Sequence, residues 1–283
     1  MTPRDGVAGV VPAAGTATRL GSPAASKELI RAYVDELRAD ESRPDGTRSD
    51  ETRPEEPLPV CYRLLHAFHE ARIPTAYVVS RSSKSDLRQT LGPGDRRTPR
   101  LHHISLAESP SPAFSVAAAT RLAGETTIAL GFPDVLWVAE AAFERLLARL
   151  DDGADVALGL FPPAPDYPTV AVTVDAQSRV RGFRPRDQTP TPKDPAWTLA
   201  VWRPVFSRLL EQEVEDRYGA EAVAAPERRH RGGPDGELGL TEILERAVDS
   251  GMRVVGEQIS EHPFLDIGEP ERLAKALRRA RGR

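Results

Sequence analysis

The chain has 283 residues and a net charge of −4, so its electrostatics do not favour nucleic acid or an anionic membrane as the main partner. No apolar run is long enough to cross a bilayer, and the N-terminus has no signal-peptide core, so we expect a soluble, cytoplasmic protein. The single cysteine, Cys61, excludes an internal disulfide and a cysteine-held zinc site, and its apolar helical neighbours indicate a buried thiol.

Strand and helix patterns alternate along the first half of the chain. Short apolar runs rich in β-branched residues or in Ala and Leu predict buried strands at residues 7–11, 75–79, 126–130 and 154–160. Apolar residues at helical spacing predict helices at residues 60–71, 113–122 and 139–150. This alternation predicts a parallel sheet with helices on both faces.

The second half is less regular. Residues 169–174 and 180–183 flank a polar turn and predict a hairpin. Further strands are expected at residues 197–202 and 253–259, and helices at residues 205–218, 241–249 and 269–281. Residues 38–57 are charged and almost without apolar side chains, and residues 221–237 carry a run of basic residues followed by two glycines, so we interpret both as mobile, solvated loops.

The turn after the first strand is built from small residues. Ala13, Ala14 and Gly15 would let a ligand approach the backbone, and successive N–H groups of such a turn can hold phosphate oxygens. Arg19 and Lys27 follow as cations. The same pattern also fits a tight strand–helix connection with surface cations, and it is neither a P-loop nor a dinucleotide fingerprint.

The sequence A-A-G-T-A-T-R-L-G, followed by S-K-E-L, resembles the signature of the sugar-phosphate nucleotidyltransferases, such as glucose-1-phosphate thymidylyl- and uridylyltransferases. Their pattern is roughly A-A-G-x-G-T-R-L, then P-K. Two positions depart from it: Ala17 replaces a glycine and Ser26 replaces the proline. Five positions match: Gly15, Thr18, Arg19, Leu20 and Lys27.

Further segments that resemble family motifs follow in the family's order over nearly the whole chain. They are P-V-C-Y-R-L-L-H-A-F-H-E-A-R-I, A-L-G-F-P-D-V-L-W, V-R-G-F-R-P, W-T-L-A-V-W-R-P-V-F, E-L-G-L-T-E-I-L and F-L-D-I-G-E-P-E-R-L. Because these segments are colinear, the resemblance is specific to the superfamily, although it does not single out one enzyme.

The resemblance implies a Rossmann-like α/β nucleotidyltransferase fold, with a mixed, mainly parallel central sheet flanked by helices and a small sugar-side subdomain. Residues 1–283 would form one domain, with a nucleotide-binding half at 1–140 and an acceptor-binding half at 141–283. The implied activity couples a nucleoside triphosphate to a sugar 1-phosphate, or a related phosphorylated acceptor, and releases pyrophosphate. The alternative is a catalytically weak homologue that binds nucleotide sugars as a regulatory subunit; either could be a homo-oligomer.

The resemblance also implies roles for individual residues. The nucleotide would contact a set of small or polar residues: Ala13, Ala14, Gly15, Thr16, Thr18, Arg19 and Glu108. Catalysis would depend on Arg19, Lys27 and Asp134, and Mg²⁺ would be held by Asp134 and Asp266. Each aspartate lies between apolar neighbours and near a glycine, where an Asx turn or a helix cap is the alternative.

On the acceptor side, Arg184 occupies the place of a family lysine that grips the sugar phosphate, and Glu242 that of a residue which binds sugar hydroxyls. A solvated arginine and a first-turn helix glutamate are the alternatives. Glu108 replaces the glutamine of a base-binding segment. Trp197 and Trp202 are interpreted as core residues rather than as a platform for a sugar.

Overall fold

The computed structural model describes residues 4–16, 21, 26–32, 58–163, 169–184, 194–228, 237–268 and 271–274. Predictions about Ala17, Thr18, Arg19 and the stretch 38–57 lie outside these residues. None of the helices within the described ranges combines the length and apolar composition that crossing a membrane requires.

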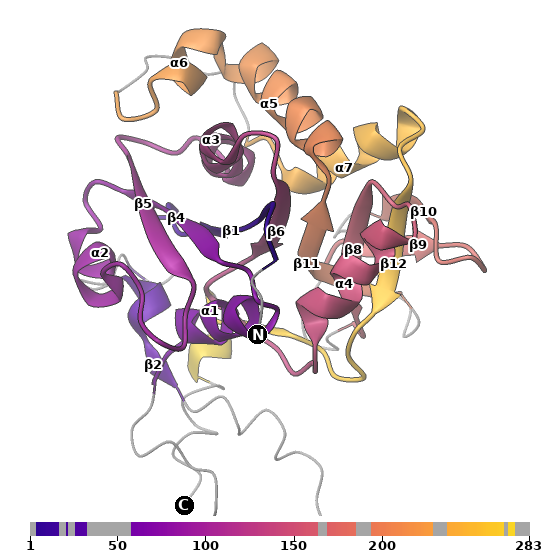
Figure 1. Ribbon diagram of the computed structural model, residues 1–283, viewed down its shortest axis with the longest axis horizontal. Coiled ribbons are helices and arrows are strands. Elements are labelled where there is room, and N and C mark those ends of the chain that lie inside the picture. Colours follow the sequence, from indigo (N-terminus) through magenta and orange to yellow (C-terminus); the bar gives the residue numbers. More distant parts are fainter. Residues whose placement is uncertain are drawn as a thin grey trace, which may run out of the picture.

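One large mixed sheet runs through the molecule (Figure 1), and nine strands of the described residues belong to it. Its first half is parallel, as the sequence predicts. In spatial order these strands are β6 (Thr127–Gly131), β1 (Val7–Pro12), β4 (Thr75–Arg81) and β5 (Arg100–Leu106).

The second half of the sheet continues beyond β6 and reverses direction. The strands of this half are β8 (Val156–Phe161), β9 (Ala171–Val174), β10 (Val180–Arg184), β11 (Ala196–Trp202) and β12 (Val254–Gln258). β11 runs antiparallel to β6 and also pairs with β8 and, at one residue, with β9, while β8 and β12 are parallel. β9 and β10 form the predicted hairpin.

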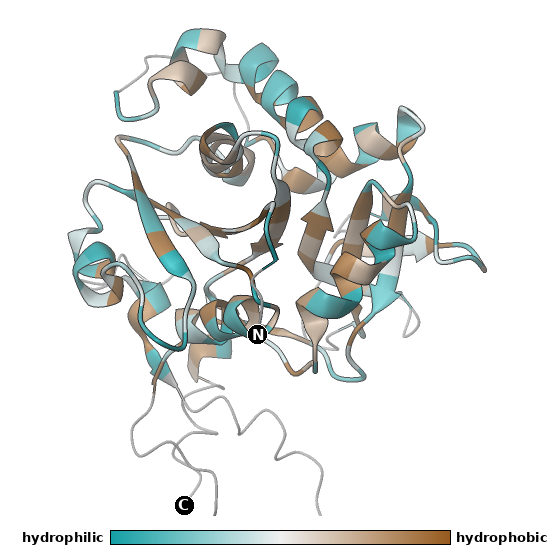
Figure 2. Cartoon of the chain, viewed as in Figure 1, coloured by the Kyte–Doolittle hydropathy of each residue, from teal (hydrophilic) through white to brown (hydrophobic). Residues whose placement is uncertain are grey.

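Helices cover both faces of the sheet (Figure 1). One face carries α3 (Pro112–Ala123), α5 (Pro204–Tyr218), α6 (Ala220–Ala224) and α7 (Leu240–Asp249); the other carries α1 (Cys61–Glu70), α2 (Ser85–Leu91) and α4 (Ala142–Asp151). Val10 and Val11 of β1 point into the two different cores. A strand buried on both faces is apolar throughout rather than alternating, which explains the continuous apolar run at residues 7–11. Figure 2 shows the same distribution, with apolar residues on the strands and polar ones on the outer helix faces.

Helix α1 buries one apolar face. Leu64, Leu65 and Phe68 are inaccessible to solvent, as their helical spacing predicts. Cys61 at its start is also buried, and burial raises the pKa of this thiol to about 12. A thiol protonated at neutral pH is a poor nucleophile, so Cys61 is a packing residue.

Some elements differ from the sequence-based expectations. The first residues of the stretch 221–237 belong to α6, where Ala222 and Val223 are buried, so this part is not a solvated loop. Helix α2 and two short ladders, β2 (Arg31–Ala32) with β3 (Leu58–Pro59) and β7 (Val135–Leu136) with β13 (Leu265–Asp266), were not anticipated. Of the expected closing helix, residues 271–274 are described and are helical.

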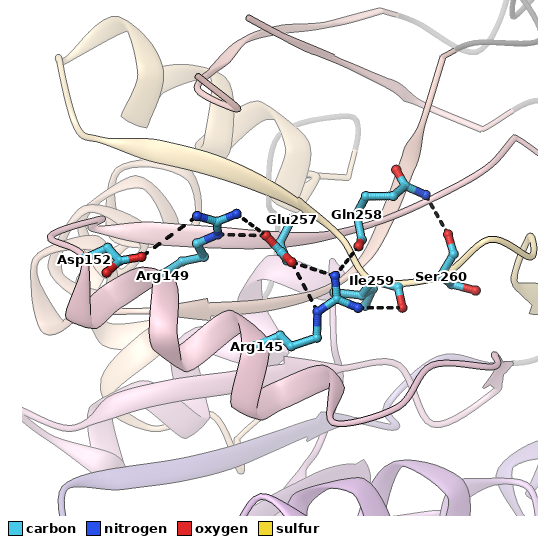
Figure 3. Close-up of polar contacts among 7 residues, drawn as sticks. All are labelled: Arg145, Arg149, Asp152, Glu257, Gln258, Ile259 and Ser260. Atoms are coloured by element: carbon cyan, nitrogen blue, oxygen red, sulfur yellow. Dashed lines mark hydrogen bonds and ion pairs between the residues drawn. The ribbon is translucent and has the colours of Figure 1, made fainter. Parts of the chain in front are cut away.

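Two arginines of α4 form ion pairs with a glutamate of the edge strand β12 (Figure 3). Arg145 Nη2 lies 2.6 Å from Glu257 Oε1, and Arg149 Nε donates to Glu257 Oε2 at 2.7 Å. Burial raises the pKa of the Glu257 carboxyl, but the hydrogen bonds and charges of both arginines outweigh it and hold the pKa below its ordinary value. Because β12 is followed by the segment that carries Asp266, these ion pairs fix the route of the chain toward the site described next.

Candidate active site

A cavity of about 710 Å³ opens where the parallel strands end. Its lining includes residues that follow or close β1, β4, β5 and β6, at the carboxyl edge where open α/β sheets bind ligands. The predicted residues that line it are Ala14, Gly15, Thr16, Lys27, Asp134 and Asp266. The fold thus brings the small-residue turn, the lysine and both aspartates to one place.

The turn after β1 is held by one cation at the end of β4 and one at the start of α2. Arg81 Nε donates to the carbonyl of Ala14 at 2.7 Å, and Lys84 Nζ donates to the carbonyl of Ala13 at 2.8 Å. Ala13 itself is buried behind the cavity wall. A methyl group added at Gly15 would meet no atom within 4 Å, so the space beside this residue is open to a ligand.

Lys27, Asp134 and Asp266 converge around Gly268. A methyl group at Gly268 would lie 2.9 Å from Asp266 Oδ1, 3.2 Å from Lys27 Nζ and 3.3 Å from Asp134 Oδ2. Lys27 and Asp134 form an ion pair, and their side chains are only 12% and 15% exposed. Burial lowers the pKa of Lys27, but the facing Asp134, helped by Glu28 and Asp266, raises it above the ordinary value. The lysine is therefore a fixed positive charge at neutral pH.

The two aspartates meet because a short ladder joins segments far apart in the sequence. Asp134 immediately precedes β7, and Asp266 ends β13. Asp266 pairs with Val135 in the antiparallel register, and the N–H of Ile267 donates to the Asp134 carbonyl at 3.0 Å. Asp266 Oδ1 also accepts the N–H of Gly268 at 2.8 Å, so the Asx turn considered as an alternative is present together with the convergence.

Aromatic rings and hydroxyls also line the cavity. Phe132 and Trp197 lie with ring centroids 6.2 Å apart, and Thr169, Thr198 and Thr241 lie on the same lining. Trp197 packs against the hydrophobic core but is only half-buried and also lines the cavity, so its interpretation as a core residue holds in part. Trp202, by contrast, is a core residue whose indole N–H donates to Ser207 Oγ at 2.9 Å.

Besides the buried Ala13, three further predicted site residues among those described do not line the cavity. Glu242 accepts the N–H of Gly239 at 3.1 Å and so caps α7, the role considered as its alternative. Arg184 on β10 pairs with Asp194, and Glu108 is exposed on the loop after β5. Thr18 and Arg19, both expected at the nucleotide, are outside the described residues.

Residues that were not predicted also line the cavity. Ser109, Ser111 and Ser115 line the cavity where the base-binding segment was expected, with Ser109 Oγ 2.7 Å from Ser115 Oγ. Arg81 also lines it and donates to the Ser109 carbonyl at 3.1 Å. The only sequence signal for Arg81 and Lys84 was their place just past a buried strand, in S-R-S-S-K-S-D.

Solved structures with the same fold cover almost the whole chain. A protein described as a glucose-1-phosphate thymidylyltransferase from Bacillus anthracis, crystallised with sucrose, superposes with a TM-score of 0.71 at 13% identity over 97% of this chain and 95% of its own. UDP-glucose pyrophosphorylase from Acinetobacter baumanii gives 0.63 at 18% identity over 95% and 91%. HddC from Yersinia pseudotuberculosis gives 0.63 at 12% identity over 95% and 97%.

No protein-family model and no curated protein matches the sequence. The likeness is therefore one of fold, and the chain has the fold of the sugar-phosphate nucleotidyltransferases. The expected fold class is confirmed, although identities of 12–18% do not transfer the activity of any of these proteins.

Proposed function

We propose that the protein transfers a nucleotidyl group from a nucleoside triphosphate to a sugar 1-phosphate and releases pyrophosphate. The observation that carries this proposal is the convergence of Lys27, Asp134 and Asp266 around Gly268, in the same cavity as the open turn at Gly15. One lysine and two carboxylates beside a phosphate-binding turn suit a reaction in which all of the reacting groups are phosphates.

The reaction needs no nucleophile from the protein. A phosphate oxygen of the acceptor attacks the α-phosphorus, a new P–O bond forms, and the bond to the bridging oxygen of the β-phosphate breaks. Pyrophosphate leaves with that electron pair. Lys27 would contact the α-phosphate, where negative charge shifts between oxygens, and the backbone of the Gly15 turn would hold the departing phosphates.

The carboxylate pair fits Mg²⁺. Oxygen ligands from one or two carboxylates, completed by phosphates and waters, are the coordination that this ion prefers. The described residues contain no cluster of three or more His, Cys, Asp or Glu side chains that could hold a metal. We assign the ion to Asp134 and Asp266 because their carboxylates converge at Gly268. When bound, the ion would neutralise phosphate charge and orient the triphosphate.

The acceptor side suits a sugar. The rings of Phe132 and Trp197 offer flat apolar surface to the C–H face of a pyranose. The hydroxyls of Thr169, Thr198 and Thr241, which can both donate and accept, match its alcohol groups. This side of the lining therefore favours a neutral polyhydroxylated body over a charged one.

A pyrophosphate-release assay tests the proposal. The purified protein would be incubated with each of four nucleoside triphosphates, a panel of sugar 1-phosphates, and Mg²⁺. We expect release with one preferred pair, and its loss on chelation with EDTA. Tight binding of a nucleotide sugar without pyrophosphate release would instead identify the protein as a regulatory homologue.

A further inference from the structure

Lys27 is held in place through its two neighbours in the chain, Ser26 and Glu28. Both neighbours contact one short segment at the start of α2. Asp86, in the first turn of that helix, accepts the Ser26 N–H at 2.6 Å and the Ser26 hydroxyl at 2.8 Å. Lys84, its N-cap residue, donates to Glu28 Oε1 at 2.8 Å and to Oε2 at 3.0 Å.

The Glu28 contact is a buried one. Its side chain is 1% exposed, and burial raises the pKa of Glu28 although Lys84 acts in the opposite direction. Lys84 uses the same ammonium to bind the carbonyl of Ala13. The start of α2 thus contacts both the turn after β1 and the residues on either side of Lys27.

The Ser26 contact restrains the backbone immediately before Lys27. Ser26 has φ −58° and ψ 127°, which is a conformation that proline adopts without strain. Proline would fix this φ by its ring, whereas serine can rotate. In this protein the carboxylate of Asp86 accepts hydrogen bonds from both the N–H and the hydroxyl of Ser26. These two hydrogen bonds restrain the Ser26 backbone, which the covalent structure of serine leaves free to rotate. Burial raises the pKa of Asp86, but the two bonds from Ser26 lower it below its ordinary value, so the carboxylate is ionised at neutral pH.

We infer that Asp86 is a positioning residue, which holds Ser26 so that the Lys27 ammonium meets Asp134 and the reacting phosphate. This inference rests on the proposed function for its kinetic consequence but not for its structural one. A lysine side chain has four rotatable bonds and reaches many positions, so restraining its backbone limits the positions that the ammonium group occupies. A displacement of about 1 Å at a reacting group can cost 10²-fold in rate.

The test compares four variants. Asp86→Ala removes both acceptors and should lower kcat about 10- to 100-fold, while the KM for the triphosphate changes less than about threefold. Asp86→Asn should stay within about threefold of wild type, because the amide oxygen accepts the N–H and the amide nitrogen donates to the hydroxyl oxygen. Ser26→Pro combined with Asp86→Ala should recover most of the lost kcat, because the proline ring restores φ and removes the donor. Asp175→Ala serves as a matched control.

Asp175 is another hydrogen-bonded aspartate, which accepts the backbone N–H groups of Gln177 and Arg179 at 2.9 Å each, but it lies in the β9–β10 turn. Its replacement should leave kcat unchanged. A purely structural role for Asp86 would lower the melting temperature without a rescue by Ser26→Pro. Failure of the double variant to recover kcat, or a normal kcat in Asp86→Ala, would overturn the inference.

A second measurement keeps the inference separate from the proposed function. Lys27 is only 12% exposed, and its acetylation by acetic anhydride can be followed by mass spectrometry. Asp86→Ala should raise the labelling rate of Lys27 severalfold, and the Ser26→Pro double variant should lower it again. If wild-type protein transfers no nucleotide, the proposed function fails and this labelling pattern alone decides the role of Asp86. Equal labelling in all variants would refute that role.

Discussion

Lys27 and Asp134 form an ion pair in a partly buried site, and the carboxylate of Asp134 helps to hold the pKa of Lys27 above its ordinary value. Under the proposed function, bound substrate and metal would replace this ion pair with new contacts. Lys27 would turn to a phosphate oxygen and Asp134 to the ion, so that no buried charge loses one partner without gaining another. On this proposal, the exchange would account for the direct contact between a lysine and an aspartate that are assigned different roles.

The metal assignment predicts that Asp134→Asn and Asp266→Asn each fold and lose most turnover, by about 100-fold or more, because a neutral amide is a poor ligand for Mg²⁺. Asp134→Asn also leaves Lys27 without its main partner, so this variant should be the less stable of the two. Steady-state pyrophosphate release and calorimetric Mg²⁺ titration measure the effect. Asp249→Asn, at the exposed end of α7, is the control, and near-normal turnover in either site variant would remove that residue from the site.

The assignment of Lys27 predicts a different kinetic signature. Lys27→Ala should reduce kcat by about 10²–10³ with a smaller effect on triphosphate affinity, because the contact strengthens as charge develops. Lys27→Arg should recover only part of the rate, since a planar guanidinium has a different reach. Arg208→Ala, a surface cation paired with Glu125, is the control. Unchanged turnover in Lys27→Ala would contradict the assignment.

At the scale of elements, the predictable strands and helices were those whose pattern reflects deep burial. β1, β4, β6 and β8 coincide with apolar runs, and α1, α3 and α4 with apolar residues at helical spacing. The ladders β2–β3 and β7–β13 contain two residues per strand, so their sequences carry no periodicity. Only tertiary contacts create them, and for that reason no local pattern anticipated them.

The same contrast holds within the site. Asp134 and Asp266 could be placed from the sequence because each belongs to a motif at a fixed point in the chain order. Arg81 and Lys84 could not, because their partners are backbone carbonyls of a turn far away in sequence. The capping contact of Glu242 was foreseeable from its place in the first turn of a helix. In the structure Glu242 makes this contact by accepting the N–H of Gly239.

The packing of α1 on β1 requires a glycine. A methyl group at Gly9 would lie 2.7 Å from Phe68 Cε2 and 3.0 Å from Ala76 Cβ. Both neighbours are buried, and one is a rigid ring. Gly9→Ala should therefore lower the free energy of unfolding by about 1–3 kcal/mol through overpacking.

Gly182 on β10 provides a matched comparison, since a methyl group there would meet no atom within 4 Å. Gly182→Ala should change stability by less than about 0.5 kcal/mol, or slightly increase it, because alanine restricts the unfolded chain. Urea denaturation of both variants measures the difference. Equal stabilities of the two variants would contradict the prediction and show that β1 and α1 move apart without loss of stability.

At the scale of the whole molecule, the long charged stretch near the N-terminus leaves and rejoins the fold at one point. Arg31 pairs with Pro59 and Ala32 with Leu58 across the β2–β3 ladder, and the N–H of Val60 donates to the Ile30 carbonyl at 2.9 Å. The two ends of the connection are therefore neighbours whatever lies between them. Such an arrangement accommodates insertions, since lengthening a loop costs only about 0.6 kcal/mol per doubling.

Replacing residues 38–57 with a Gly/Ser linker of about six residues should consequently leave the melting temperature unchanged or raise it slightly, because a shorter loop loses less entropy on closure. The composition supports this result: the stretch has almost no apolar side chain to pack against the body. Differential scanning calorimetry measures it, and a same-length scramble of residues 38–57 controls for sequence-specific contacts. Pyrophosphate release should be measured in parallel, because the stretch follows Lys27 closely in the sequence. A large fall in melting temperature would contradict the prediction and show that the stretch packs against the body or a partner subunit.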